Sequence, residues 1–314
     1  GAAPRALAGT ITLQQTVDLV RLSIDVVEHD IDGLLEPADA DDVRAAVLRY
    51  ARELAFATAE VYARAAELRG AWDARLEALV VDAVLRAETD ETMLSRASAV
   101  GWGARGDVAV VLGDLPERRD EAALFDEVRR MARAGAMDAL CATQGDRLVV
   151  LLGGVSEPRV AGALLVDVFG PGPLVVGPVA EDLGHAHVSA RAALAAYRAA
   201  PGWPDAPRPV LSAELLPERA LAGDGHARRH LVDDVYLRLA ERGELVTTLA
   251  AYLDQGGSIE GAARRLFVHP NTVRYRLRQM ADLTGLTPNQ ARDAFTLQVA
   301  LVLGRQSGRT PADL

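Results

Sequence analysis

The chain has 314 residues; half are hydrophobic, a quarter are charged, and the formal net charge is −10. This length is long for one domain and suits two or three. The acidic balance excludes a protein that coats nucleic acid along its whole surface, although it leaves room for a local basic patch. All 34 basic residues are arginine, which a genomic codon bias explains more simply than function does.

The cysteine content and the hydropathy pattern indicate where the protein works. A single cysteine, Cys141, excludes an internal disulfide and suits a reducing compartment, and its apolar neighbours predict a small core residue. Residues 1–9 do not read as a signal peptide. The longest uncharged run, 168–180, contains three glycines and three prolines and is too short to cross a bilayer. We therefore expect a soluble, cytoplasmic protein with no membrane partner.

The N-terminal region, residues 1–100, is predicted to be a helical domain. Residues 11–32 and 39–100 carry helical periodicity, and one stripe holds Val43, Val47, Tyr50, Leu54 and Val61. Residues 76–85 are more fully apolar. A stripe this wide suits a helix packed on several sides or a dimer seam, and tertiary core is the alternative that the sequence leaves open. If the protein is a dimer, this stripe and the central sheet are the surfaces expected to pair.

The pattern changes near residue 101, and residues 101–215 are predicted to form an α/β domain. Strands are expected at 108–112, 138–143, 147–152 and 174–177, and helices at 120–134, 160–168 and 185–199. Gln144-Gly145-Asp146 is a hairpin signal between the second and third strands. The order β-α-β-β-α-β-α favours a mixed sheet. A proline-rich loop at 201–209 closes this domain.

Residues 216–314 are predicted to be helical, with helices at 227–239 and 244–254. Ser258 is expected to cap the next helix, and Pro270 to begin the one after it. Small residues (Gly261, Ala262, Ala263) permit close helix packing, Leu266 and Val268 close the core, and Val273, Leu277 and Met280 give the last helix a buried face. This is the pattern of a helix-turn-helix, within residues 244–303.

The opposite face of that last helix holds Asn271, Arg274, Tyr275 and Arg278. Side chains near the start of such a helix reach base edges, where arginine matches guanine and asparagine matches adenine. Residues 258–280 contain five arginines and one acid, a local charge of +4. Charge and periodicity alone fit a solvated arginine face equally well. The complete set of predicted DNA-binding residues is Ser258, Arg264, Arg265, His269, Asn271, Thr272, Arg274, Tyr275 and Arg278.

The segment 245–277, continuing to 283–285, resembles the C-terminal domain of the PucR/CdaR family of bacterial regulators. Its core, His269-Pro-Asn-Thr-Val-Arg-Tyr-Arg-Leu277, is a specific signature of that family. The resemblance implies a transcriptional regulator that binds a double-stranded DNA operator. Because one motif offers only about four side chains to the bases, we expect a symmetric homodimer on an inverted repeat.

Residues 105–212 resemble the domain related to diguanylate cyclases that often precedes the DNA-binding domain in this family. Active cyclases carry Gly-Gly-Asp/Glu-Glu-Phe on a hairpin, whereas this chain reads Thr143-Gln-Gly-Asp-Arg-Leu148. Arg147 stands where an acid is expected, so the resemblance implies a degenerate GGDEF-like domain, no enzyme activity and no cofactor. Residues 49–53 and 60–66 resemble actinobacterial members associated with fatty-acid synthesis genes.

Other clusters are weaker. His226 and His230 have i, i+4 spacing but no evident third ligand, so no metal site is predicted. His185 and His187 would share a face only in a strand, and their segment is predicted to be helical. The overall expectation is an α+β multidomain regulator with an unidentified effector. The alternatives are a nucleotide or metabolite sensor that uses the central domain, and a protein whose C-terminal helices bind another protein.

Overall fold

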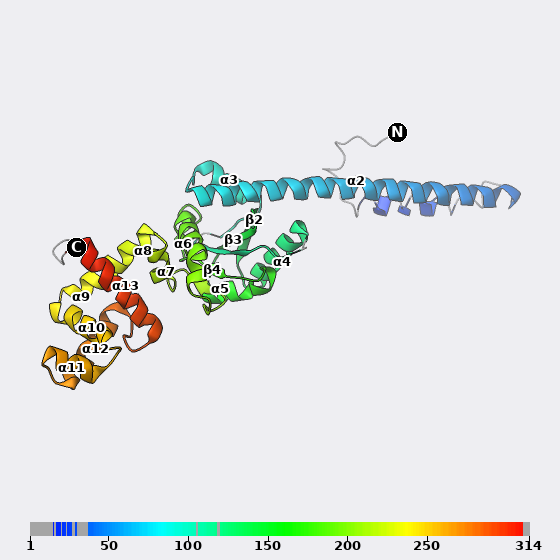
Figure 1. Ribbon diagram of the computed structural model, residues 1–314. Coiled ribbons are helices and arrows are strands. Elements are labelled where there is room, and N and C mark those ends of the chain that lie inside the picture. The colour runs from blue at the N-terminus through cyan, green and yellow to red at the C-terminus, as the bar shows by residue number, and fades with distance from the viewer. Residues whose placement is uncertain are drawn as a thin grey trace. The chain divides into compact units, whose positions relative to one another are not determined.

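The computed structural model describes residues 15, 17–19, 21–22, 24–26, 29, 37–104, 106–117 and 120–309, and the chain divides into two compact units, 1–76 and 77–314. Most of the predicted helix 11–32 lies outside the described residues; those of its residues that are described are helical. Helix α2, Pro37–Arg86, provides most of the described part of the first unit and continues into the second (Figure 1). Among the described residues, no helix is long and apolar enough to span a membrane.

The predicted helix 39–100 is interrupted. Ala87 adopts a left-handed conformation (φ 60°), which ends α2, and Asp90 then accepts a hydrogen bond from the Met93 N–H at 2.8 Å. This side-chain cap begins α3, Glu91–Ala99. The chain therefore turns back on itself at a point that no glycine or proline marks.

The second unit contains a five-stranded mixed sheet in the order β2-β3-β1-β4-β5. The strands are β1 (Ala109–Asp114), β2 (Asp138–Gln144), β3 (Arg147–Gly153), β4 (Leu174–Val176) and β5 (Val210–Leu211). The three pairings β2–β3, β3–β1 and β1–β4 are antiparallel, and β4 pairs with β5 in parallel. The predicted mixed sheet is confirmed, and the two-residue β5, directly after the proline-rich loop, is an addition to it.

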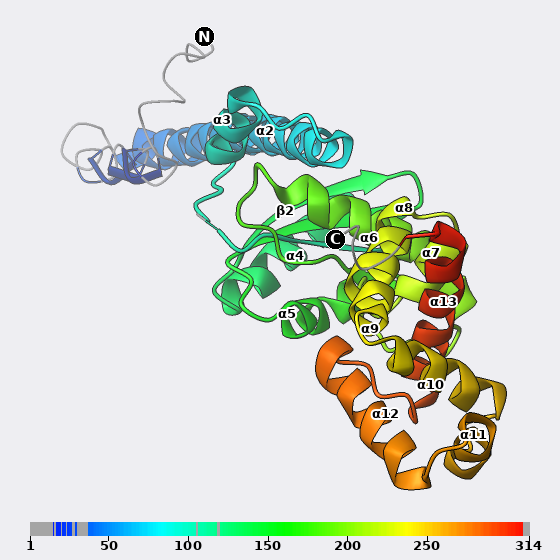
Figure 2. The same cartoon turned by 90° about the vertical axis from the view of Figure 1, so that its left-hand side faces the viewer.

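Apolar side chains alternate between the two faces of this sheet, and helices cover both faces (Figure 2). Val110 and Leu112 of β1 pack on the face covered by the end of α2, by α3 and by α6 (Ala186–Ala199). Ala109 and Val111 pack on the other face, against α4 (Glu121–Ala134), α5 (Pro158–Leu164) and the short helix η2 (Val166–Val168). Because both faces are covered, the central strands read as continuous apolar runs.

The apolar stripe at 76–85 belongs to this core. Val80, Val81 and Val84 are fully buried against the sheet, whereas Leu79 is 41% exposed. The expectation that this stripe forms a dimer seam is therefore wrong for its three valines, because the face of their own sheet already covers them.

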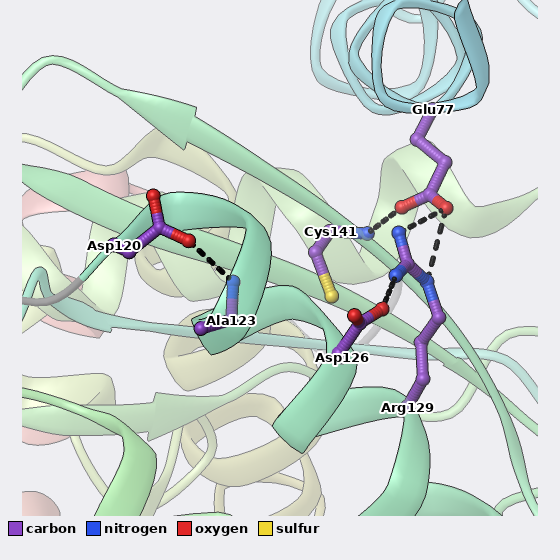
Figure 3. Close-up of polar contacts among 6 residues, drawn as sticks. All are labelled: Glu77, Asp120, Ala123, Asp126, Arg129 and Cys141. Atoms are coloured by element: carbon purple, nitrogen blue, oxygen red, sulfur yellow. Dashed lines mark hydrogen bonds and ion pairs between the residues drawn. The ribbon is translucent and has the colours of Figure 1, made fainter. Parts of the chain in front are cut away.

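A buried ion pair ties this end of α2 to the sheet (Figure 3). The Glu77 carboxylate accepts hydrogen bonds from Arg129 Nη2 of α4 at 2.6 Å and from the Cys141 backbone N–H of β2 at 3.1 Å. Burial, with the Glu77 charge, raises the pKa of the Cys141 thiol. Cys141 is therefore a protonated core residue, as predicted.

The rest of the second unit is helical. A third apolar core joins its helices, and Figure 2 shows α10 to α13 gathered together. In chain order the elements are η3 (Ala200–Gly202), α7 (Leu216–Leu221), α8 (Gly225–His230), the π-helix η4 (Leu231–Leu237), α9 (Arg238–Ala240), α10 (Gly243–Asp254), α11 (Ile259–Leu266), α12 (Pro270–Thr284) and α13 (Ala291–Ser307).

Candidate nucleic-acid interface

Helices α11 and α12 form the predicted helix-turn-helix. The Ser258 hydroxyl accepts the Gly261 N–H at 3.0 Å and caps α11, as expected. A Cβ atom on Gly261 would lie 3.0 Å from Gln255 Oε1 and 3.2 Å from Ser258 Oγ. The small residue at this position thus lets α11 start directly against the turn that precedes it.

The turn between the two helices is held by backbone geometry. Phe267 ends α11 in a left-handed conformation (φ 56°, ψ 41°), and the Val268 N–H bonds to the Ala263 carbonyl at 3.1 Å. His269 then caps α12, because its Nδ1 accepts the Asn271 N–H at 3.2 Å. Pro270 occupies the first position of the helix, as predicted.

The two faces of α12 separate as the periodicity predicted. Val273, Leu277 and Met280 are buried in the third core, while Leu266 and Val268 pack against that core half-buried. The predicted residues on the other side are solvent-exposed, except for half-buried Thr272: Asn271, Arg274, Tyr275 and Arg278. Arg264, Arg265 and His269 are exposed as well, and Ser258 is half-buried.

Polar contacts arrange the exposed face. Arg274 Nη1 donates to Asn271 Oδ1 at 2.9 Å, and its Nη2 lies 3.3 Å from Glu260 Oε1 of α11. These two contacts orient a long side chain at the surface, near the N-terminal end of α12. Arg265 lies 3.2 Å from Asp254. Within the described part of the chain, the side chains of Arg264 and Arg278 make no hydrogen bond or ion pair.

Two residues depart from the sequence reasoning. Arg276, one of the five arginines counted in the local charge, is half-buried and donates to Thr248 Oγ1 of α10 at 3.1 Å, so it holds α12 on α10. Phe267 was not predicted as a surface residue, yet 96% of it is exposed. An apolar residue in the turn normally signals burial, but Phe267 holds a left-handed backbone conformation that the sequence does not reveal.

The hairpin of the central domain is also as predicted. In the β2–β3 pairing, Asp138 stands opposite Gly153 at one end and Gln144 opposite Arg147 at the other. Gly145 has the positive φ (66°) that the turn between them requires. The Arg147 guanidinium lies 5.2 Å from the centre of the Tyr197 ring, and the Tyr197 hydroxyl donates to Asp114. Burial and this bond to Asp114 raise the pKa of Tyr197 to about 12.

No group of three or more His, Cys, Asp or Glu residues within the described ranges could hold a metal ion. The acid at the end of β1, Asp114, is engaged by Tyr197, and Arg147 occupies the place of the expected second acid. Asp114 thus accepts a hydrogen bond from Tyr197 and stands opposite Arg147 in the β1–β3 register.

The four histidines for which no metal site is predicted make local contacts. His226 Nε2 lies 2.8 Å from Arg191 Nη1, and His230 Nδ1 lies 2.8 Å from Asp234 Oδ2. His185 precedes α6, where its hydrogen bond to Asp182 raises the pKa of the imidazole. His187 Nδ1 lies 3.2 Å from the Gly184 carbonyl oxygen.

Two family models match this chain: the PucR C-terminal helix-turn-helix domain over residues 245–303, and a GGDEF-like domain over residues 86–199. The crystal structure of the regulator of polyketide synthase expression from Bifidobacterium adolescentis is 31% identical, with a TM-score of 0.64, and the match covers 74% of this chain and 94% of that one. This chain belongs to the family of PucR-type helix-turn-helix regulators.

Relatives of this PucR-type regulator occur in mycobacteria. Uncharacterized protein Rv2242 of Mycobacterium tuberculosis (strain H37Rv) and Uncharacterized protein Mb2266 of Mycobacterium bovis are each 42% identical over 318 residues, which is 98% of this chain and 77% of theirs. A Haemophilus influenzae protein is 40% identical over 63 residues, covering 20% of this chain and 17% of its own. The PucR-type and GGDEF-like resemblances are therefore confirmed.

Proposed function

We propose that this protein is a sequence-specific transcriptional regulator that reads double-stranded DNA with α12 as its recognition helix. The observation that carries the proposal is the two-sided character of α12. One side is buried in the core, and the other presents Asn271, Arg274, Tyr275 and Arg278 to solvent. A short helix that is anchored in this way and exposed near its N-terminal end suits the major groove.

The exposed residues divide into two roles. Asn271 and Arg274 lie in the first turns of α12, where side chains reach base edges. Arg264, Arg265 and Arg278, together with the polar groups of Ser258, His269 and Thr272, suit contacts with phosphates, and Tyr275 adds an exposed ring. Phe267 is included in this interface, because it is exposed in the turn that follows Arg264 and Arg265 in the sequence.

The test uses DNA fragments selected from the genome by the purified full chain. Asn271→Ala and Arg274→Ala should each weaken binding to a selected fragment by roughly 1–3 kcal/mol, or about 5- to 150-fold. Since these two side chains hydrogen-bond each other, the double variant should lose less than the sum of the two. Arg305→Ala, an exposed arginine on α13, serves as the matched control and should bind as wild type. Unchanged affinity in both interface variants would refute the assignment.

The regulator is proposed to act as a homodimer on an inverted repeat, with half-sites about 34–36 Å apart. Because the valines of the 76–85 stripe are already buried, the apolar residues available for pairing lie earlier on α2, where Tyr50, Phe56 and Val61 are mostly exposed. Light scattering should give twice the chain mass, and footprinting should show two symmetric half-sites. A monomer with one unrepeated footprint would contradict the proposal.

The central GGDEF-like domain is proposed to be non-catalytic. Its hairpin retains Gly145 and Asp146 but places Arg147 against Tyr197 instead of presenting a second acid. Incubation of the purified protein with GTP and Mg²⁺ should yield no cyclic di-GMP above a control without protein. Detectable product would overturn the proposal.

The target genes are proposed to be those of fatty-acid biosynthesis. The regulator itself is proposed to work in the cytoplasm. The support is the resemblance of residues 49–53 and 60–66 to regulators associated with such genes, together with the similarity to a regulator of polyketide synthase expression. The selected genomic fragments should be enriched for promoters of fatty-acid biosynthesis genes. Selection of unrelated promoters alone would remove this assignment and leave DNA binding itself intact.

A further inference from the structure

A cavity of about 540 Å³ opens between the C-terminal end of α2, one face of α6, and the connection from α7 to α8. All of these residues belong to the unit 77–314. The volume falls within the range of small-ligand sites. The cavity is separate from the exposed face of α12 and from the GGDEF-like hairpin, because residues of neither line it.

The lining of this cavity is strongly basic. It carries four arginines and one carboxylate, so its formal charge is +3 with the histidine neutral, in a chain whose net charge is −10. The ionisable lining residues are Arg86, His187, Arg191, Arg198, Arg219 and Asp224.

The acid in the lining is already neutralised. Asp224 Oδ2 lies 2.8 Å from Arg219 Nη2, and both side chains are nearly buried. Burial would raise the pKa of Asp224, but the hydrogen bond and charge of Arg219 outweigh it and lower that pKa. Arg219 and Asp224 therefore neutralise each other, and Asp224 does not balance the charge of the other arginines in the lining.

Arg86 pairs with Asp82 of α2, so helix α6 supplies the uncompensated charge. His187, Arg191 and Arg198 follow helical spacings of four and seven, which place them on one face. Arg191 Nη1 lies 2.8 Å from His226 Nε2. Over the described ranges, the side chain of Arg198 makes no hydrogen bond or ion pair. Two guanidinium groups thus line one cavity without a carboxylate partner.

The remaining lining is apolar. Leu85 from α2 and Leu194 from α6 lie beside the arginines, together with Ala87, Ala195 and Ala222. A ligand that satisfies both parts has an anionic head and an apolar portion. Guanidinium groups bind phosphate through paired hydrogen bonds, and a phosphate dianion balances both of the guanidinium groups that lack a carboxylate partner, whereas a carboxylate balances one.

We propose that this cavity binds a small organic phosphate with an apolar portion, held by Arg191 and Arg198. One wall of the cavity precedes α8, which packs directly on η4 and so leads into the helices that carry α11 and α12. A ligand that bridges α6 and this wall would favour one arrangement of them. Its role as the effector rests on the proposed function, whereas its binding does not.

The test measures binding to the full chain by calorimetry, without DNA, using monohexyl phosphate, inorganic phosphate and hexanoate as probes. Monohexyl phosphate should bind with a Kd of about 1 mM or tighter, and more tightly than the other two. The variant R191A/R198A should bind it at least about tenfold more weakly. Arg130→Ala, which removes an exposed arginine of α4 outside the cavity, should bind as wild type.

Circular dichroism of R191A/R198A checks that the variant is folded. A folded double variant that binds monohexyl phosphate as tightly as wild type would overturn the proposal, as would no binding by wild type. Tighter binding of hexanoate would overturn the assignment of phosphate. Because no DNA is present, a failure here is distinguishable from a failure of the DNA-binding proposal.

Discussion

Replacing Phe267 by glycine should make the protein more stable. Phe267 holds a left-handed backbone conformation (φ 56°), which costs a residue with a Cβ atom roughly 1–2 kcal/mol. Glycine removes that cost. Its greater freedom in the unfolded chain, however, destabilises the folded state by about 0.5–1 kcal/mol. The ring is 96% exposed, so its removal sacrifices almost no burial. The difference between these two terms is a net gain of about 0–1.5 kcal/mol.

The same substitution should weaken DNA binding. The ring projects from the turn between α11 and α12, and a phenylalanine in that place suits apolar contact with a thymine methyl group. Losing one such contact should cost about 1 kcal/mol, or roughly fivefold in Kd. Stability and affinity are therefore expected to change in opposite directions, which a general disturbance of the fold cannot produce.

The assays are urea denaturation of the full chain and fluorescence anisotropy with a selected DNA fragment. Ala136→Gly is the matched control, because Ala136 is also exposed and left-handed (φ 57°) but lies in the turn between α4 and β2. It should show the same stabilisation and unchanged affinity. A less stable Phe267→Gly protein would refute the strain argument. Full affinity in that variant would refute the contact with DNA.

Two further predictions concern packing. A Cβ atom on Gly304 of α13 would overlap the ring of Tyr236, so Gly304→Ala should lower the free energy of unfolding by about 2–3 kcal/mol in urea denaturation; a loss below about 0.5 kcal/mol would show that the helices separate easily. Glu77→Ala should lower the free energy of unfolding by about 3–5 kcal/mol, because the half-buried Arg129 guanidinium and the Cys141 N–H both lose their acceptor. Glu77→Gln should cost clearly less, and equal losses for the two variants would contradict this account.

Local patterns predicted most of the elements. The cap of α11, the hairpin at Gly145 and the two faces of α12 each depend on residues within a few positions of one another, so the sequence carries them directly. The strand Val210–Leu211 escaped prediction because it exists only through its parallel pairing with β4, more than thirty residues away along the chain. Its two residues carry no pattern of their own.

The partner of an apolar surface is harder to predict than the surface itself. Residues 76–85 are apolar enough for a core or a dimer seam, and only the fold shows that the sheet covers Val80, Val81 and Val84. The candidate interface divides in the same way. Periodicity places Asn271 and Arg274 on the exposed face, but it cannot show that Arg276 instead binds Thr248, because that contact joins separate helices.

The alanines of α6 have a structural role. The side of this helix that faces the sheet consists of alanines and Ser189, including Ala186, Ala190 and Ala193, all fully buried. Small side chains let the helix lie so close that the Ser189 hydroxyl accepts the Val110 backbone N–H of β1 at 2.9 Å. This close packing, together with the Ser189 hydrogen bond, fixes the rotation of α6 about its axis. The same rotation turns Arg191 and Arg198 toward the cavity, so the packing of the alanine face positions the basic face.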